Sequence, residues 1–272
     1  MDGPEKLARS LRGFRHFTIT EATLYVLFAG LLWLALYVLL RRRFRSRRLS
    51  VHEPTAPQIA REIVHSLRSL VIFGLVTGGA VFAIYSGWTQ MYRGIDSRGW
   101  TWWVLSFAIV VLVHDTYFYW THRLMHHRRL YRLFHRTHHL SINPTPWAAY
   151  AFSPLEALVQ AGIGPLVVFT IPMHSSVFMG FMVWQIAFNV FGHCGYELWP
   201  KGFLRTWLGW ILNTPTHHAL HHEKFRENYG LYFNVWDRLM ATNHRLYEQR
   251  FAEATDGKIA ASAGPIKAPS SA

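Results

Sequence analysis

The sequence contains a single cysteine and few acidic residues. With one thiol in 272 residues, Cys194 has no partner in the chain, so a framework of internal disulfide bonds is excluded. No glycine-rich phosphate loop, dinucleotide fingerprint or internal repeat is found, which argues against a nucleotide-binding enzyme and a repeat protein. Only 15 Asp and Glu oppose 28 Lys and Arg, and the net charge is +13.

The excess of positive charge has to be interpreted together with the apolar content. A basic chain can bind nucleic acid, but 51% of these residues are hydrophobic and 12 are tryptophan. Long uncharged runs with basic loops between them are typical of membrane proteins, in which the basic loops stay on one side. We therefore expect a membrane as a partner and no nucleic acid.

Four segments are apolar enough to enter a bilayer, whose hydrocarbon core takes about 20 helical residues. They are Ala22–Leu40, Ser69–Trp88, Trp100–Thr121 and Ala157–Tyr196. Pro172 lies near the middle of the last segment and predicts a hairpin of two short helices. In the second segment, Gly74, Gly78 and Gly79 predict close contact with another helix.

The predicted fold class is all-α, a polytopic membrane protein with about four to five membrane helices, the last two a hairpin, and a cytoplasmic, histidine-rich helical cap. Six arginines directly follow the first segment, which places residues 41–68 in the cytoplasm, and counting spans brings every histidine cluster to that side. We divide the chain into an N-terminal segment (1–21), two membrane helices with a basic loop (22–99), a histidine-rich domain (100–251) and a small, polar tail (252–272) expected to be disordered.

The histidines are concentrated in short clusters. Six of the 17 lie between His122 and His139. The clusters consist of one pair four residues apart and two copies of H-x-x-H-H, namely His122 and His126, then His135, His138 and His139, then His218, His221 and His222. Residues three and four apart share a helix face, and Thr214 and Pro215 predict the start of a helix under the last copy. Because neutral imidazole is the commonest protein metal ligand, the clusters predict a site for two metal ions.

The remaining histidines are weaker candidates for metal ligands. The isolated residues His16, His52, His65, His174 and His244 are interpreted as surface or interface side chains. His127 and His217 adjoin cluster members but point about 100° away from them, so either role stays open. A basic stripe at the lipid headgroups accounts for the neighbouring arginines but not for the repeated histidine spacing.

Four further residues are candidates through their position. His193 follows the predicted hairpin and returns to the surface where the clusters begin, so it is a candidate ligand, with Glu197 four residues later as an additional one. His114 and Asp115 share a helix face with His122 but lie up to two turns deeper. Asp115 is expected to orient a ligand imidazole by accepting its second N–H.

These motifs resemble the fatty acid hydroxylase and sterol desaturase superfamily of integral membrane, non-haem di-metal oxygenases. The resemblance covers about residues 113–242 and rests on FYWTHRLMHHRRLYRLFHRTHH, NPTPWAAYAFSPLEALVQ and HHALHHEKFRENYGLYFNVWDR, which look most like C-5 sterol desaturases. It implies catalytic metal ligands at His122, His126, His135, His138, His139, His193, His218, His221 and His222. Related hydroxylases place a tenth histidine where this chain has Glu197, and C-5 desaturases have histidine where it has Ser153, so their substrate specificity does not transfer directly.

The resemblance implies an oxidoreductase that uses O2 on the C–H bonds of a lipid. Iron is redox-active and zinc is not, so we expect two Fe ions at the histidines, with zinc as a competing occupant in purified protein. The chain has no flavin, nicotinamide or haem motif, so electrons must come from an external donor such as cytochrome b5 or a ferredoxin with its reductase. Arg123, Arg128, Arg129 and Arg132 are expected to be exposed and to dock this carrier.

The expected substrate is a sterol or another polycyclic terpenoid lipid that enters from the bilayer, and a fatty-acyl or sphingolipid hydroxylase is the alternative. Desaturation and hydroxylation both stay open, as does the choice between the bacterial inner membrane and the endoplasmic reticulum. Outside the oxygenases, a zinc-dependent membrane hydrolase would need a motif such as H-E-x-x-H, which is absent. A metal transporter or another metal-binding protein would place its ligands mid-membrane, and a b-type cytochrome would pair histidines across spans.

Overall fold

The computed structural model describes residues 3–259 and confirms the all-α class. The described chain is helical apart from one parallel pair of two-residue strands, β1 (Met91–Tyr92) and β2 (Met173–His174). The longer helices are α1 (Gly3–Trp33), α3 (Ala56–Tyr85), α4 (Gly99–Met125), α6 (Pro154–Ala161), α7 (Ile163–Thr170), α8 (Ser175–Gly192), α10 (Pro215–Lys224) and α12 (Tyr247–Thr255). Short helices are α2 (Arg41–Phe44), α5 (Tyr131–Phe134), α9 (Trp207–Ile211) and α11 (Val235–Leu239). Single turns are η1 (Leu34–Leu39), η2 (Arg45–Arg47), η3 (Ile95–Ser97), η4 (His138–Leu140), η5 (Pro146–Tyr150) and η6 (Phe203–Arg205).

Four helices are long and apolar enough to cross a membrane, which agrees with the prediction of four to five. They contain Leu7–Leu39, Ala56–Tyr85, Gly99–Met125 and Ser175–Gly192, and a shorter apolar stretch covers Pro154–Thr170. Their outer faces expose large apolar side chains such as Leu31, Leu75 and Leu112. Such faces suit lipid, which solvates them without the free-energy cost that water imposes.

Two predicted helix starts are wrong. The first apolar helix was expected to begin at Ala22, but α1 runs without interruption from Gly3, so most of residues 1–21 belong to the same helix. The second was expected from Ser69, but α3 begins at Ala56, where the Thr55 side chain accepts a hydrogen bond from the Gln58 backbone N–H. The polar first turns of both helices interrupt the hydropathy signal but not the helical backbone.

Close packing between α1 and α3 depends on glycine. A Cβ atom added at Gly74 would lie 2.7 Å from the Thr18 hydroxyl oxygen, and one at Gly78 would lie 3.1 Å from the Phe14 ring. These two positions confirm the predicted close contact, since only glycine lets the backbones approach so near. Gly79 has no neighbour within 4 Å of such an atom, so the prediction is wrong at that position.

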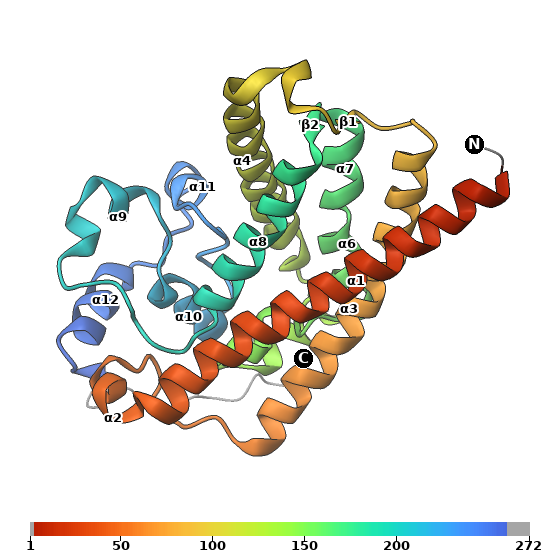
Figure 1. The fold of residues 1–272 in the computed structure, drawn as a ribbon. Coiled ribbons are helices and arrows are strands. Elements are labelled where there is room, and N and C mark those ends of the chain that lie inside the picture. The colour runs from red at the N-terminus through yellow and green to blue at the C-terminus, as the bar shows by residue number, and fades with distance from the viewer. Residues whose placement is uncertain (1–2, 260–272) are drawn as a thin grey trace.

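The predicted hairpin is present, with its first arm divided. Helices α6 and α7 form one short arm and α8 the other, and the chain reverses through β2, next to Pro172. Figure 1 shows α1 lying diagonally across the front of the molecule, with α3 beside it and α4, α7 and α8 behind. Helices α9 to α12 gather on the left of this view, beside the lower end of α8.

The predicted tail begins later than expected. Residues 252–255 complete α12, and Ala254 and Ile259 pack with Leu49 in a small apolar cluster. The prediction of disorder from residue 252 is therefore wrong for residues 252–259, because Ala254 and Ile259 are apolar enough to be buried. Residues 260–272 lie outside the described part of the chain.

Candidate metal centre

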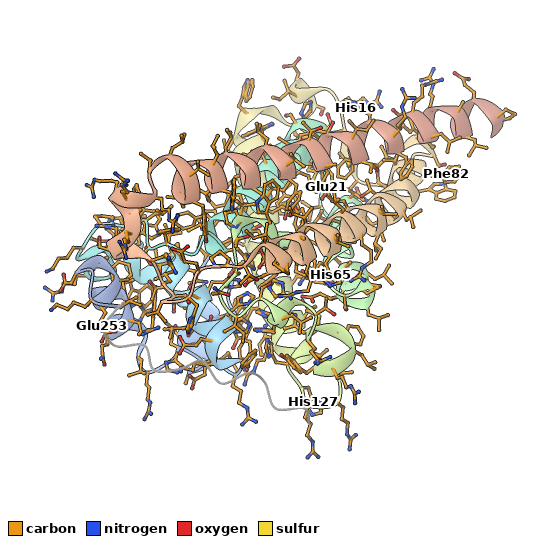
Figure 2. The ribbon with its side chains drawn as sticks, turned by 90° about the horizontal axis from the view of Figure 1, so that it is seen from below. His16, Glu21, His65, Phe82, His127 and Glu253 are labelled. Carbon is orange, nitrogen blue, oxygen red and sulfur yellow. The ribbon has the colours of Figure 1, made fainter. Side chains whose placement is uncertain are left out.

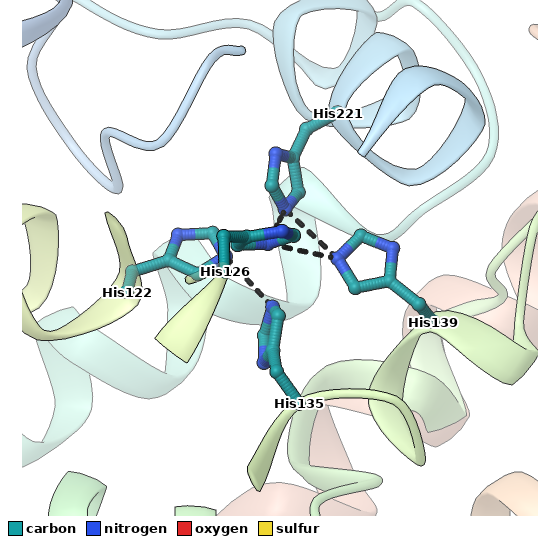
Figure 3. A group of neighbouring side chains, drawn as sticks. All are labelled: His122, His126, His135, His139 and His221. Atoms are coloured by element: carbon teal, nitrogen blue, oxygen red, sulfur yellow. Dashed lines mark hydrogen bonds between the residues drawn. The ribbon is translucent and has the colours of Figure 1, made fainter. Parts of the chain in front are cut away.

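Nine buried or nearly buried histidines form two neighbouring groups. The five-histidine group consists of His122, His126, His135, His139 and His221, and the four-histidine group of His138, His193, His218 and His222. In each group one nitrogen per ring lies within 4.8 Å of all the others. Figure 3 shows the rings of the five-histidine group pointing inward from separate segments of the chain. The two groups adjoin, because the ring centroids of His139 and His222 are 4.8 Å apart.

Different local structures present these rings. His122 lies in the last turn of α4, and His126 is the residue at which that helix ends. The three histidines of the last cluster project from α10, which begins as predicted at Pro215 with the Thr214 side chain accepting from the His217 N–H. The first H-x-x-H-H copy does not share one α-helical face as expected, because His135 ends the four-residue helix α5 and His138 begins the turn η4.

Each H-x-x-H-H copy divides its side chains between the groups. In the first copy, His135 and His139 belong to the five-histidine group, whereas His138 belongs to the other. In the second copy, His218 and His222 belong to the four-histidine group, whereas His221 belongs to the five-histidine group. Each copy of the motif therefore contributes histidines to both groups and does not form a metal site of its own.

Hydrogen bonds at the outer ring nitrogens fix the tautomer of several histidines. The Nδ1 atoms of His122, His193 and His221 lie 2.8, 2.7 and 2.7 Å from the backbone carbonyl oxygens of Tyr229, Asn189 and Glu227. A carbonyl oxygen can only accept, so each Nδ1 carries the proton. In the neutral ring Nε2 is then left with a lone pair, the atom with which imidazole binds metal.

The inward nitrogens meet at distances that need a cation between them. His122 Nε2 lies 2.8 Å from His135 Nε2, and His126, His139 and His221 form a triangle of Nε2 atoms with sides of 3.0 to 3.2 Å. Where both rings carry their proton on Nδ1, two lone pairs face each other without a hydrogen between them. A bound cation removes this repulsion, so the residues fit a metal centre.

The rings do not gain an extra proton that would separate the facing lone pairs. Burial, reinforced by the neighbouring imidazoles, holds the pKa values of His138, His139 and His221 well below the ordinary histidine range. Burial likewise lowers the pKa of His193 to about 4. The rings are therefore neutral at physiological pH, which is the form that binds metal.

Glu156 orients a histidine, and the sequence analysis missed it. Its Oε1 atom accepts a hydrogen bond of 2.6 Å from His135 Nδ1, and both side chains are buried. Ser153, the position that departs from the C-5 desaturases, caps α6 by accepting from the Glu156 N–H and so fixes the start of the helix that carries this carboxylate. The S-x-x-E pattern signals a helix start, in which the glutamate is expected to bond back to the cap. Nothing in the sequence pattern indicates that this glutamate turns to His135 instead.

Asp115 was expected in the role that Glu156 fills, and that expectation is wrong. Asp115 Oδ1 accepts hydrogen bonds from the backbone N–H groups of Tyr232 and Phe233. His114 Nδ1 lies 2.8 Å from the Tyr232 hydroxyl and belongs to neither histidine group. Both residues thus hold the segment after α10 against α4, rather than contacting a metal ligand.

Glu197 and His217 also lie outside the two groups. Glu197 accepts from the Trp199 N–H with one oxygen and from the Thr216 N–H and hydroxyl with the other. It therefore anchors the first turn of α10 and has no oxygen directed to a histidine. His217 Nε2 lies 3.3 Å from Asp237, whose carboxylate in turn accepts from the backbone N–H of Tyr229.

Six other histidines were interpreted as surface or interface residues, except His127, whose role was left open. His16, His52, His65, His127, His174 and His244 are absent from both groups. Figure 2 shows His16 and His65 on α1 and α3 and His127 at the lower edge of the molecule. Arg128, Arg129 and Arg132 are exposed as predicted, but Arg123 is half-buried and donates to the Tyr119 hydroxyl.

An apolar cavity adjoins both histidine groups. It has a volume of about 590 Å³ counted with its open mouth, and its walls come from α1, α3 and η5 as well as from the predicted α4 and hairpin. Phe118 and Phe152 line it, and their ring centroids lie 5.0 Å from the His122 ring and 5.2 Å from the His138 ring.

Comparison with known proteins identifies the family. A family model described as fatty acid hydroxylase matches residues 107–242, which include all nine histidines. The chain is 31% identical to the Delta(7)-sterol 5(6)-desaturase erg3C of Aspergillus fumigatus over 260 residues, covering 82% of this chain and 77% of the relative. It is 35% identical to the ERG3B enzyme of the same description from Gibberella zeae and 32% identical to the lathosterol oxidase of Rattus norvegicus.

These last two alignments cover 66% and 67% of this chain, and 55% and 60% of the relatives, so the chain spans little more than half of their length. No solved structure matches the chain significantly. The matched segment contains both histidine groups, α4 from Phe107 onward and the whole hairpin. With its apolar helices and its histidine clusters, the chain belongs to the fatty acid hydroxylase family and is similar to sterol desaturases.

Proposed function

We propose that this chain is a membrane-bound, O2-dependent di-iron oxidoreductase that acts on a C–H bond of a sterol or related polycyclic lipid. The observation that carries the proposal is the convergence of Nε2 lone pairs in two adjoining, buried histidine groups. A single zinc ion takes about four protein ligands, so nine imidazoles exceed the needs of one such site. Iron at both groups would supply the redox chemistry that an unactivated C–H bond requires.

The protein's own residues would hold and tune this centre. The five-histidine group would bind one ion and the four-histidine group the other. Glu156 and the carbonyl of Tyr229 keep the proton of His135 and His122 on Nδ1, so that Nε2 stays available as a ligand. Burial of the rings excludes bulk water, which protects a reactive site from side reactions.

The substrate would reach the centre through the cavity beside it. Its mostly apolar wall suits a lipid, and Phe118 and Phe152 would position the lipid carbons against the two histidine groups. The similarity to sterol desaturases favours a sterol over a fatty-acyl chain. The product, an alkene or an alcohol, would distinguish desaturation from hydroxylation.

The electron donor would be a separate acidic protein such as a cytochrome b5 or a ferredoxin. Arg128, Arg129 and Arg132 are exposed on the segment that links the two first histidine clusters, and opposite charge would speed the encounter. Neutralising all three should slow reduction by the protein carrier but not by dithionite. Equal slowing with both reductants would contradict this role. By the positive-inside argument this face, and with it the active site, would be cytoplasmic.

The decisive experiment is a metal analysis of protein purified anaerobically in mild detergent after growth with iron-57. About two irons per chain with a magnetically coupled Mössbauer spectrum would support the proposal. The same sample, given reductant and O2, should convert a Δ7-sterol to a new product seen by mass spectrometry. One tightly held zinc, with no activity after iron replacement, would instead indicate a hydrolase or a metal-binding protein, and a product from fatty-acyl lipid alone would indicate the hydroxylase.

A further inference from the structure

A carboxylic acid lies in the wall of the apolar cavity, on a helix that carries none of the nine clustered histidines. Glu21 projects from the middle of α1, is 4% exposed and lines the cavity. Its Oε2 atom is buried and has no hydrogen-bond partner, and no ion pair of Glu21 is found within residues 3–259. Figure 2 shows it on α1, facing the packed side chains of the helices beneath. An unpaired ionisable group within a membrane helix is costly and marks a functional site.

Other polar groups line the same cavity. Gln160, on α6, also lines it, is 9% exposed, and its Nε2 amide has no acceptor. Gln185, on α8, donates a 2.6 Å hydrogen bond to the Tyr150 hydroxyl, and both residues belong to the cavity wall. The cavity therefore combines an unused acceptor on Glu21, an unused donor on Gln160 and otherwise mostly apolar walls.

The cavity extends beyond the residues that adjoin the metal centre. Gln185 precedes His193 by eight residues in and just after α8, which corresponds to about 12 Å along the helix axis. Phe118 and Phe152 line the same cavity next to the histidine rings. A molecule that fills the cavity would thus lie beside the metal centre and also contact Glu21 and Gln160.

We infer that Glu21 and Gln160 form a recognition site for the hydroxyl group of a lipid alcohol, and that Glu21 determines specificity for it. A hydroxyl donates one hydrogen bond and accepts others, so it satisfies the Glu21 oxygen and the Gln160 amide together. An ammonium group has no lone pair and would leave the Gln160 amide unpaired. The inference rests on the proposed function only in taking this cavity as the lipid site, and it adds the group by which the lipid is held.

The test compares a 3-hydroxysterol with its 3-O-methyl ether, which keeps the shape and loses the donated hydrogen. Affinities of the tritiated lipids are measured on metal-free protein in detergent, so that the result does not depend on redox activity. Wild-type protein should bind the alcohol about tenfold more tightly than the ether, since an unpaired buried polar group is left when the donor is missing. Glu21→Leu should bring this ratio close to one.

Three further variants keep the result interpretable. Phe178→Leu alters the apolar wall of the same cavity and should weaken both lipids equally, leaving the ratio unchanged. If Glu21→Leu fails to fold, Glu21→Gln and Gln160→Leu should each lower the ratio severalfold in folded protein. An unchanged ratio in folded Glu21 and Gln160 variants, equal binding of alcohol and ether by wild-type protein, or tighter binding of the 3-amino analogue would overturn the inference. If the wild-type protein with iron does not oxidise lipid but still prefers the alcohol to the ether about tenfold, this would count against the proposed function alone.

Discussion

Replacing Glu156 by alanine tests how the protein orients a metal ligand. The substitution leaves the Nδ1–H of His135 buried without the oxygen that now lies 2.6 Å away. His135 then no longer favours the tautomer with a free Nε2, and its ring is free to rotate. We expect the five-histidine group to bind iron more weakly, while the four-histidine group, which contains no partner of Glu156, is less affected.

The size of the effect follows from the lost hydrogen bond. A buried N–H left without an acceptor costs about 1–3 kcal/mol. If all of this cost falls on the metal-bound state, iron affinity drops between about fivefold and 150-fold, close to the 10- to 100-fold range typical of partners of ligand histidines. Glu156→Gln retains an acceptor oxygen and should lose less.

An anaerobic titration with ferrous iron in the presence of a competing chelator measures this change. Wild-type protein should take up two ions per chain, and Glu156→Ala should reach half-saturation at a higher concentration of free iron. Glu248→Ala, at an exposed position on α12, is the control for loss of a carboxylate. The reasoning is refuted if the titration of Glu156→Ala coincides with that of the wild type.

Three further predictions concern the ligands, pH and helix packing. His138→Ala should abolish lipid oxidation and remove about one iron per chain without changing the far-ultraviolet circular dichroism; full activity would remove the basis of the proposed centre. Because burial lowers the pKa of His193 to about 4, the unfolded chain binds more protons than the folded chain between about pH 6.5 and pH 4. This contribution to stability is fully present above about pH 6.5 and is lost as the pH falls, so the Tm of metal-free protein should decrease through that window, and a constant Tm would contradict it. Gly74→Ala should lower the free energy of unfolding in detergent by about 1–3 kcal/mol, because its Cβ would lie 2.7 Å from the Thr18 hydroxyl oxygen. Gly79→Ala, in open space, should raise this free energy by up to about 1 kcal/mol. Similar changes in both variants would exclude the packing argument.

The sequence predicted the helical class, the hairpin and the start of α10, because these depend on local signals. The cap at Thr214 and the break at Pro172 act within a few residues of the structures they delimit. The histidine clusters were visible for the same reason, since spacing along the chain is local information. The start of α1 at Gly3 was missed because polar residues interrupt the hydropathy pattern without interrupting the helix.

What the sequence could not reveal depends on contacts between distant segments. Nothing in the spacing shows that His138 and His139 face different groups, because that division is set by the turn η4 and by the approach of α10. Asp115 was the expected partner for an imidazole, and Glu156 was not considered. Only the packing of α6 beside α5 brings the first to His135, while the second is taken by backbone N–H groups 117 and 118 residues away.

The division of adjacent histidines between the two groups has a consequence for metal loading. His138 and His139 share one turn, and His221 and His222 share another, yet each pair serves both groups. An ion in one group would immobilise the backbone that presents ligands to the other. The entropy of these turns would therefore be lost when the first ion binds and not again when the second binds. The second ion would then bind more tightly than the first, and uptake would be cooperative. The protein would pass between empty and doubly loaded forms, and a single redox-active ion, able to react with O2 without its neighbour, would be a scarce species.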